Sequence, residues 1–411
     1  MVWQSILGII VFIGIAILLS ENQGKISWRI IFFGLGSQLL LAVILIKVPF
    51  FQIIFIAINN TILALQNATK AGTSFVFGYL GGGTLPFSET YPEATFIIAF
   101  QALPLILFVS ALSSLLFHWR ILPFIIQGFS YILERTFRIG GATSLATAAN
   151  IFIGMVEAPI LIRPYLNRLG RGELFIVMTA GMATVAGTVL LLYAALIGDI
   201  IADAISHILI ASLMSAPAAI MIAKLLIPDS SQTSGSIKIP QNSSAMGAIA
   251  QGTTEGIKLL INIIAMLIVM VALVELVNIL LSLLPTLNSK PLTLERILGW
   301  LMAPIVWLMG IHIDDATTAG RLIGIKIVLN EFLAYVALAG ETGQGLSERS
   351  KLIMTYGLCG FANFGSLGIM IGGLTGLAPE RRNEIISLSG KSMISGTLAT
   401  CMTGSVAGIL L

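Results

Sequence analysis

The sequence predicts an all-α polytopic membrane protein, with eight transmembrane helices and two re-entrant helical hairpins arranged as an inverted repeat. Three observations support this fold class. Of the 411 residues, 57% are hydrophobic and only 10% are charged, whereas soluble domains carry roughly 25% charged residues. Many apolar stretches reach the length of about 20 residues that a helix needs to cross a bilayer. The same order of segments also occurs twice along the chain.

The composition excludes several classes of protein. With 22 basic and 19 acidic residues, the chain has too few charges to coat a soluble particle, and its net charge of +3 leaves no basic face for nucleic acid. It is also too apolar to remain disordered in water. Three histidines and two cysteines without clustered spacing give metal-dependent catalysis almost no support. We therefore expect no enzymatic cofactor.

The predicted elements follow in chain order. The first apolar stretch has no basic residue ahead of it and no cleavage motif, so it is interpreted as a retained span and not as a signal peptide. Stretch 50–66 is apolar with polar breaks, which is typical of a helix at the membrane interface. The full-length spans are 2–20, 28–46, 94–117, 174–197, 200–226, 257–285, 351–373 and 384–410.

Segments 122–168 and 294–339 are apolar but interrupted by Gly, Pro, Asn and charged residues. Each is long enough to enter the membrane and return as a hairpin, and each is followed by two spans. A polar linker at 227–244 and the single crossing 257–285 separate the copies, so the second copy is inverted relative to the first. Inverted repeats with interrupted helices point to the midplane binding site of a transporter.

The distribution of basic residues predicts the orientation of the chain. The loop that contains Arg349 and Lys351 falls outside in this arrangement, so the charge rule is obeyed only in part. Both termini are then external. The basic residues placed inside are Arg163, Arg168, Arg171, Lys224, Arg381 and Arg382.

Two carboxylates lie within predicted membrane segments, where an ionisable residue is costly and points to a function. Glu157 lies at the turn of the first hairpin and Glu331 in the second. Their equivalent places in the repeat favour a functional role. The alternative is a buried ion pair, either Glu331 with Lys326 or Glu157 with Arg163.

The span after each hairpin is rich in glycine and hydroxyl residues, at 179–188 and 357–366. Such small residues can simply allow close helix packing. That interpretation fits Asn363 poorly, because its amide needs hydrogen-bond partners inside the bilayer. Unwound backbone at both places would instead expose carbonyls and helix ends to a polar solute or cation.

Residues 324–335 read Gly-x-Lys-x-x-x-Asn-Glu-Phe-x-Ala-Tyr and resemble the signature of the concentrative nucleoside transporter family. Segments 71–83, 150–166, 303–310 and 358–373 agree with this resemblance, which runs over nearly the whole chain. It implies a sodium-driven nucleoside symporter of the elevator type, a homotrimer in the inner (plasma) membrane. A scaffold would be formed by 1–121 and by the linker and helix of 227–285, and a moving transport domain by the repeats 122–226 and 286–411.

The resemblance also implies a substrate site. Glu331, Asn363 and Ser366 match the residues that hold the ribose hydroxyls, and Phe361 is expected near the base. Ionised Glu331 would accept charge-assisted hydrogen bonds, which are strong in a dry site. Val189 matches the apolar residue that faces the base.

The first hairpin departs from the family pattern, which usually reads Gly-Gln-Thr/Ser-Glu. Here the segment is Gly154-Met155-Val156-Glu157. The glutamate is kept, but apolar residues stand at the two positions where the family has polar side chains that would contact the base. Thr143 also stands where the family often has an acidic residue. These departures leave the nucleobase preference open.

The sodium ligands implied by the resemblance are oxygen atoms of Asn150, Ile153, Thr184 and Val185. All-oxygen ligation suits a hard cation. A proton-coupled nucleoside, modified-nucleoside or purine permease of the same fold is the alternative. Two other classes of protein have less support. One is an intramembrane enzyme that uses Glu157 and Glu331 as acid and base. The other is a passive channel, which has no need of two matched hairpins.

Overall fold

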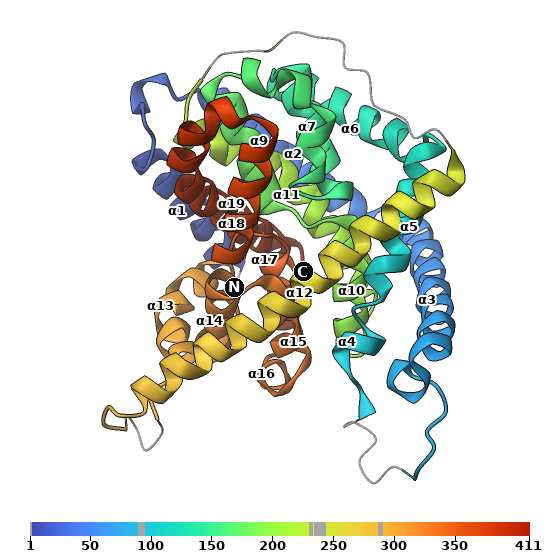
Figure 1. The fold of residues 1–411 in the computed structure, drawn as a ribbon. Coiled ribbons are helices and arrows are strands. Elements are labelled where there is room, and N and C mark those ends of the chain that lie inside the picture. The colour runs from blue at the N-terminus through green and yellow to red at the C-terminus, as the bar shows by residue number, and fades with distance from the viewer. Residues whose placement is uncertain (1, 89–94, 230–232, 234–243, 287–290) are drawn as a thin grey trace.

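The computed structural model describes residues 2–88, 95–229, 233, 244–286 and 291–411, and every regular element in this part is helical (Figure 1). By length and composition, seven of the described helices can cross a membrane, or eight if the bent pair α13–α14 counts as one span. The α-helices are α1 (Val2–Leu18), α2 (Trp28–Lys47), α3 (Pro49–Phe77), α4 (Ile98–Gln101), α5 (Leu105–His118), α6 (Ile121–Phe137), α7 (Gly141–Ile153), α8 (Glu157–Leu161), α9 (Arg171–Ala183), α10 (Gly187–Ile197), α11 (Ala204–Leu226), α12 (Ala245–Leu281), α13 (Leu294–Leu308), α14 (Ile313–Val328), α15 (Glu331–Ala339), α16 (Glu341–Gln344), α17 (Glu348–Leu358), α18 (Phe364–Leu377) and α19 (Arg382–Leu410). The 3-10 turns that lie wholly within the described residues are η1 (Gln23–Lys25), η2 (Gly78–Gly81), η4 (Arg163–Arg168) and η5 (Pro379–Arg381).

The chain builds one set of helices twice. The first copy runs from α6 to α11 and the second from α13 to α19. In both copies the leading helix packs against the first hairpin arm, α6 on α7 and α13 on α14. The closing helix, α11 or α19, packs against both halves of a broken span. The predicted inverted repeat is therefore confirmed.

The hairpins are narrower than the sequence predicted. They consist of α7 with α8 and of α14 with α15, whereas α6 and α13 are separate helices that precede them. A left-handed backbone at Arg138, φ 49°, ends α6, and Gly310, φ 99°, separates α13 from α14, whose axes differ by 116°. Each leading helix is apolar, as is the hairpin that follows it, so the apolar pattern of the sequence did not separate the two.

Both predicted breaks in the glycine-rich spans are present. The helix stops between α9 and α10 at 184–186, and between α17 and α18 at 359–363. The two breaks meet, since the Phe361 amide donates to the Thr184 carbonyl at 3.4 Å. Gly360 permits this contact, because a Cβ there would lie 2.9 Å from the Ala183 oxygen. Unwound backbone from the two repeats therefore meets at the centre of the molecule.

A long helix lies across the two repeats. Helix α12 has 37 residues and runs diagonally across the front of Figure 1, packed along α5. It begins at Ala245, twelve residues before the predicted span 257–285. Helix α3 continues well beyond stretch 50–66, and its length and composition allow a full span. Its place at the membrane interface stays a prediction.

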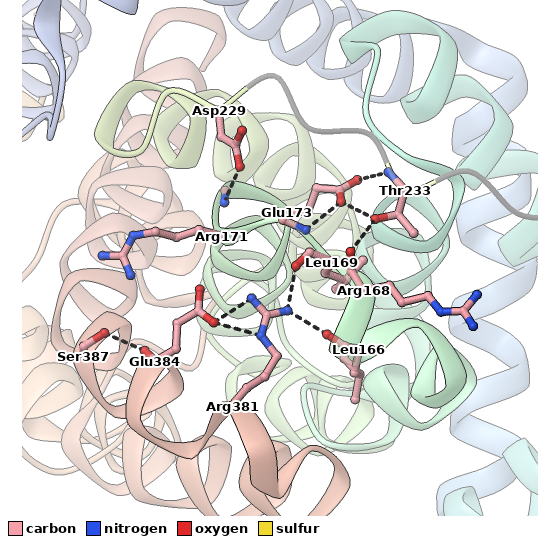
Figure 2. Close-up of polar contacts among 12 residues, drawn as sticks. Leu166, Arg168, Leu169, Arg171, Glu173, Asp229, Thr233, Arg381, Glu384 and Ser387 are labelled. Atoms are coloured by element: carbon pink, nitrogen blue, oxygen red, sulfur yellow. Dashed lines mark hydrogen bonds and ion pairs between the residues drawn. The ribbon is translucent and has the colours of Figure 1, made fainter.

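One end of the molecule, called the basic end below, carries basic residues of both repeats. Arg381 donates to the carbonyls of Leu166 and Leu169 at 2.7 and 2.8 Å, so basic residues of both repeats lie at one end (Figure 2). At the other end the Ser5 hydroxyl donates to the Met309 carbonyl at 3.0 Å, and helix α19 finishes beside it. The chain termini are therefore together, opposite the basic end.

Candidate substrate and cation sites

A cavity of about 330 Å³ lies between the hairpin turns, the second halves of the broken spans and α12. Pockets that take small ligands start at roughly this volume. All the residues that the resemblance assigned to the substrate line this one cavity: Met155, Val156, Glu157, Val189, Glu331, Phe361, Asn363 and Ser366. The structure brings them together from α8, α10, α15, α18 and the segments beside them.

Glu331 is the best-held carboxylate in the cavity. It is the first residue of α15 and only 5% exposed. The Tyr193 hydroxyl donates to its Oε1 at 2.6 Å, and the Asn363 amide donates to its Oε2 at 2.8 Å. A carboxylate offers about four acceptor positions. The two side-chain donors therefore leave acceptor capacity on this carboxylate.

Asparagine caps fix the segments that carry these groups. Asn363 is the N-cap residue before α18, and its Oδ1 accepts from the Ser366 amide at 2.7 Å. Asn330 caps α15 in the same way, and its Oδ1 accepts from the Leu333 amide at 2.9 Å. Asparagine is among the preferred residues at such positions because its side chain satisfies an otherwise unpaired amide. Asn363 thus both caps a helix and orients Glu331.

Neither ion pair considered from the sequence is present among the described residues. Lys326 is 1% exposed, and its Nζ donates to the Gly357 carbonyl at 2.8 Å and to Thr400 Oγ1 at 2.9 Å. The interpretation of Lys326 as the ion-pair partner of Glu331 was therefore wrong, as was a pair between Glu157 and Arg163. This ammonium group holds the end of α17 just before its break.

Glu157 differs from Glu331 although it also begins the second arm of a hairpin. Its side chain is open to the cavity, and no described side chain donates a hydrogen bond to it. The carboxylate lies over Gly154, where a Cβ would be 2.8 Å from Oε2. Gly154 also has φ 95°, which a side chain would disfavour. This glycine therefore sets the turn and makes room for the carboxylate.

Met155 and Val156 are packed against glycines of neighbouring helices. The Met155 Cβ would lie 2.8 Å from a Cβ on Gly181, and a Val156 methyl 2.9 Å from one on Gly373. Both side chains still line the cavity. The wall at this point is therefore apolar and closely fitted.

Several lining residues were missed from the sequence. Tyr193 stood alone in an apolar span, and nothing in the pattern linked it to Glu331. Glu255, Lys258 and Asn262 line the cavity from α12. Their spacing of three and four residues places them on one helix face, and that polar row in a span was the signal that could have identified them. Thr188 and Asn330 also line the cavity.

The predicted cation ligands lie where α7 ends beside the first break. Asn150 is 1% exposed, and neither its amide oxygen nor its amide nitrogen has a hydrogen-bond partner among the residues that the structure describes. Thr184 Oγ1 lies 3.4 Å from the Asn150 carbonyl and donates to Ala180 at 2.9 Å. Ile153 ends α7, and Val185 lies in the break. A buried amide oxygen without a partner, beside a hydroxyl and unwound carbonyls, fits a hard cation.

Family comparisons cover most of the chain. Residues 7–80 match the model described as Na+ dependent nucleoside transporter N-terminus, and residues 207–408 match the corresponding C-terminus model. Residues 99–200 match a model described as nucleoside recognition. Together these matches include both hairpins and both broken spans.

Similar proteins include curated relatives and solved structures. The chain is 36% identical to the uncharacterized transporter YutK of Bacillus subtilis over 99% of this chain and 98% of the relative. It is 35% identical to human solute carrier family 28 member 3, over 98% of this chain and 59% of that protein. The structure of CNTnw in an inward-facing substrate-bound state matches with a TM-score of 0.91 at 33% identity, over 99% and 98% of the two chains.

Proposed function

Since the chain belongs to the concentrative nucleoside transporter family, whose members are transporters and not enzymes, we propose that it takes up nucleosides by symport with sodium. The observation that carries the proposal is the buried Glu331 carboxylate, held by Tyr193 and Asn363 with acceptor positions left in a cavity of about 330 Å³. A ribose with two hydroxyls supplies the donors that this carboxylate lacks.

The proposed substrate pose follows from the chemistry of the two cavity walls. Glu331, Asn363 and Ser366 bind the ribose, and Phe361 lies near the base. Met155, Val156 and Val189 form the wall that faces the base, and Glu157 adds a carboxylate at its edge. Because two of these positions lack the polar groups usual in the family, the base is held mainly by packing. The transporter then accepts bases of different outline while it still requires the ribose hydroxyls.

Sodium is the proposed coupling ion. The buried Asn150 oxygen without a partner supports this choice, together with the Thr184 hydroxyl and the carbonyls of Ile153 and Val185. Coupling to a proton would leave the buried Asn150 oxygen without a cation to coordinate. A proton-coupled permease of the same fold is the second candidate.

The proposed mechanism is of the elevator type. The two repeats, 122–226 and 286–411, form the moving transport domain, while 1–121 and 227–285 form the scaffold that includes α12. A homologue is known in inward-facing substrate-bound and, as a variant, outward-facing states. We propose a homotrimer in the inner (plasma) membrane with both termini outside, because the basic end described above then lies in the cytoplasm.

Purified protein in proteoliposomes tests the proposal. Labelled uridine or adenosine should accumulate with an inward sodium gradient and not with a proton gradient alone. Substrate preloaded inside should accelerate uptake, because a carrier exchanges across the membrane and a channel does not. Accumulation that follows the proton gradient and ignores sodium would favour the second candidate. Flux without acceleration by preloading would indicate a channel.

A further inference from the structure

A second cavity, of about 490 Å³, lies at the basic end of the molecule, away from the substrate cavity. Its walls are the start of α2 with the turn before it, the end of α6 and the end of α11. These three segments are far apart in the sequence: α6 and α11 open and close the first repeat, and α2 precedes both repeats. The family resemblance assigns no role to this cavity, and the substrate site does not include it.

The charge of this cavity is strongly positive. Lys25, Arg29, Arg138 and Lys224 line it, with Asp229 as the acidic residue in the lining. Asp229 accepts a hydrogen bond from the Gly172 amide at the start of α9 at 3.0 Å, so its carboxylate is already partly engaged (Figure 2). Four basic side chains around one carboxylate leave an excess of positive charge. The cavity therefore favours an anion.

Two of the basic groups are positioned by neighbouring contacts. The Lys224 ammonium donates to the Phe137 carbonyl at 3.3 Å, which ties the end of α11 to the end of α6. The Arg29 guanidinium lies 5.1 Å from the centre of the Phe33 ring, a cation–π distance. A guanidinium beside an ammonium suits phosphate oxygens, because arginine offers a planar fork of donors and lysine a point charge.

The surroundings place the cavity mouth at the level of lipid headgroups. On α2, Trp28 and Phe32 are each 76% exposed, and aromatic residues gather at membrane interfaces. Helix α6 exposes Phe124, 78%, and Ile132, 59%, and carries charged residues near its end. An apolar face of this kind beside charged groups is typical of a helix lying in the interface. Acyl chains can therefore reach the aromatic rings next to the basic cavity.

We propose that this cavity binds the phosphate group of an anionic phospholipid. Basic pockets between membrane helices on the cytoplasmic side bind such headgroups, and this end is the cytoplasmic one in the orientation proposed above. A free phosphate ion offers the same oxygens but no acyl chain for the exposed face of Trp28 and Phe32. The bound lipid links α2, α6 and α11 at one point.

The test uses the full-length protein in detergent. Phosphatidylglycerol, phosphatidylcholine or inorganic phosphate is titrated, and the melting temperature and the number of bound lipids by native mass spectrometry are recorded. Phosphatidylglycerol should bind and raise the melting temperature, and phosphatidylcholine should do neither. The double variant Lys25→Gln with Arg29→Gln should bind phosphatidylglycerol roughly 10- to 30-fold more weakly. The control Lys47→Gln with Lys70→Gln removes the same charge outside the cavity and should bind like the wild type.

Three results would overturn the proposal. They are unchanged phosphatidylglycerol binding in the double variant, equal binding of phosphatidylcholine, and stabilisation by inorganic phosphate that matches the lipid. The last result would assign the cavity to a soluble anion. If the double variant does not fold, Lys25→Gln alone, at an exposed side chain in the turn before α2, should still weaken binding about fivefold. Wild-type affinity in that single variant would also reject the site.

Discussion

The two repeats differ in how polar groups beside their hairpins and broken spans are paired. In the second repeat the buried Lys326 is satisfied by a carbonyl and a hydroxyl, and Glu331 by Tyr193 and Asn363. In the first repeat several buried polar groups near the corresponding break have no hydrogen-bond partner among the described residues. The buried side-chain atoms there without a hydrogen bond belong to Thr143, Thr147, Asn150 and Thr179.

The two repeats share the same contact between the first hairpin arm and the broken span. In both repeats the last turn of the first hairpin arm touches the end of the first half of the broken span. In the second repeat Lys326 donates to the Gly357 carbonyl across this contact, and in the first the Thr184 hydroxyl lies 3.4 Å from the Asn150 carbonyl. The second repeat thus contains its own cation, the lysine ammonium. The first repeat offers oxygen atoms at the corresponding place, which supports the proposed sodium site there.

The largest expected effect concerns the carboxylates. Glu331→Gln keeps the shape but loses the charge, so it should cost about 1.5–3 kcal/mol of nucleoside binding, since hydrogen bonds to charged groups are the strong ones. Nucleoside affinity of the purified protein measures this loss. The matched change Glu157→Gln should cost less, because no described side chain bonds that carboxylate. Equal losses of affinity in the two variants would show that the two carboxylates do not differ in their contribution to binding. Wild-type affinity of a folded Glu331→Gln protein would exclude Glu331 as the residue that binds the ribose.

The second prediction concerns Lys326, the internal cation of the second repeat. Lys326→Met removes the partner of the buried Gly357 carbonyl, and an unsatisfied buried acceptor costs about 1–3 kcal/mol. We expect the free energy of unfolding to fall by about this amount and uptake to fall with it, because Gly357 precedes the break that ends at Asn363. Lys391→Met is the control. Its pair with Glu21 is half-exposed, so it should cost at most about 1 kcal/mol. A Lys326→Met protein as stable and active as the wild type would show that the ammonium is dispensable.

The third prediction concerns the first repeat. Asn150→Ala and Thr184→Ala each remove a proposed sodium ligand, so each should raise the sodium concentration for half-maximal uptake several-fold. Sodium should also raise the melting temperature of the wild type and should do so less in either variant, since a ligand stabilises the state that it binds. Thr143→Ala removes an equally buried hydroxyl from the same helix and should leave the sodium response unchanged. The same loss in all three variants would argue against a localised cation site.

Much of this arrangement could be predicted from the sequence, and the limits have physical causes. Glu157 and Glu331 stand out because carboxylates are rare in apolar segments, and the breaks because glycine and asparagine gather there. The role of Lys326 could not be predicted, because its partners come from α17 and α19 and only folding brings them together. Helix α6 was predicted as part of the hairpin because most of its residues are apolar. Its amphipathic pattern includes charged residues only near its end, at Glu134 and Arg135.

The fourth prediction tests the apolar wall of the first hairpin. Met155→Gln with Val156→Thr restores the polar groups usual in the family with little change of volume, so the contacts with Gly181 and Gly373 are kept. The variant should shift preference toward uridine and cytidine, because a site that hydrogen-bonds a base edge rejects analogues which leave its polar groups unpaired. Competition of labelled uptake by uridine, cytidine, adenosine and their 3′-deoxy forms measures the rank order. Strong uridine selectivity in the wild type, or an unchanged order in the variant, would exclude these positions from specificity.

The smallest expected effect concerns an ion pair that joins the repeats. Glu21 accepts from Arg171 of the first repeat at 2.9 Å and from Lys391 of the second at 2.7 Å. The hydrogen bond from Arg171 is the main reason why the pKa of Glu21 is held below its ordinary value of 4.5. The stabilisation is therefore present above pH 4.5 and is lost as the pH falls through the lowered pKa. Glu21→Gln should cost about 0–1 kcal/mol at neutral pH, since the pair is partly exposed, and this difference from the wild type should vanish in acid. Glu348→Gln, which breaks only a local pair with Lys351, is the control, and an equal, pH-independent loss in both variants would show that Glu21 does not join the repeats.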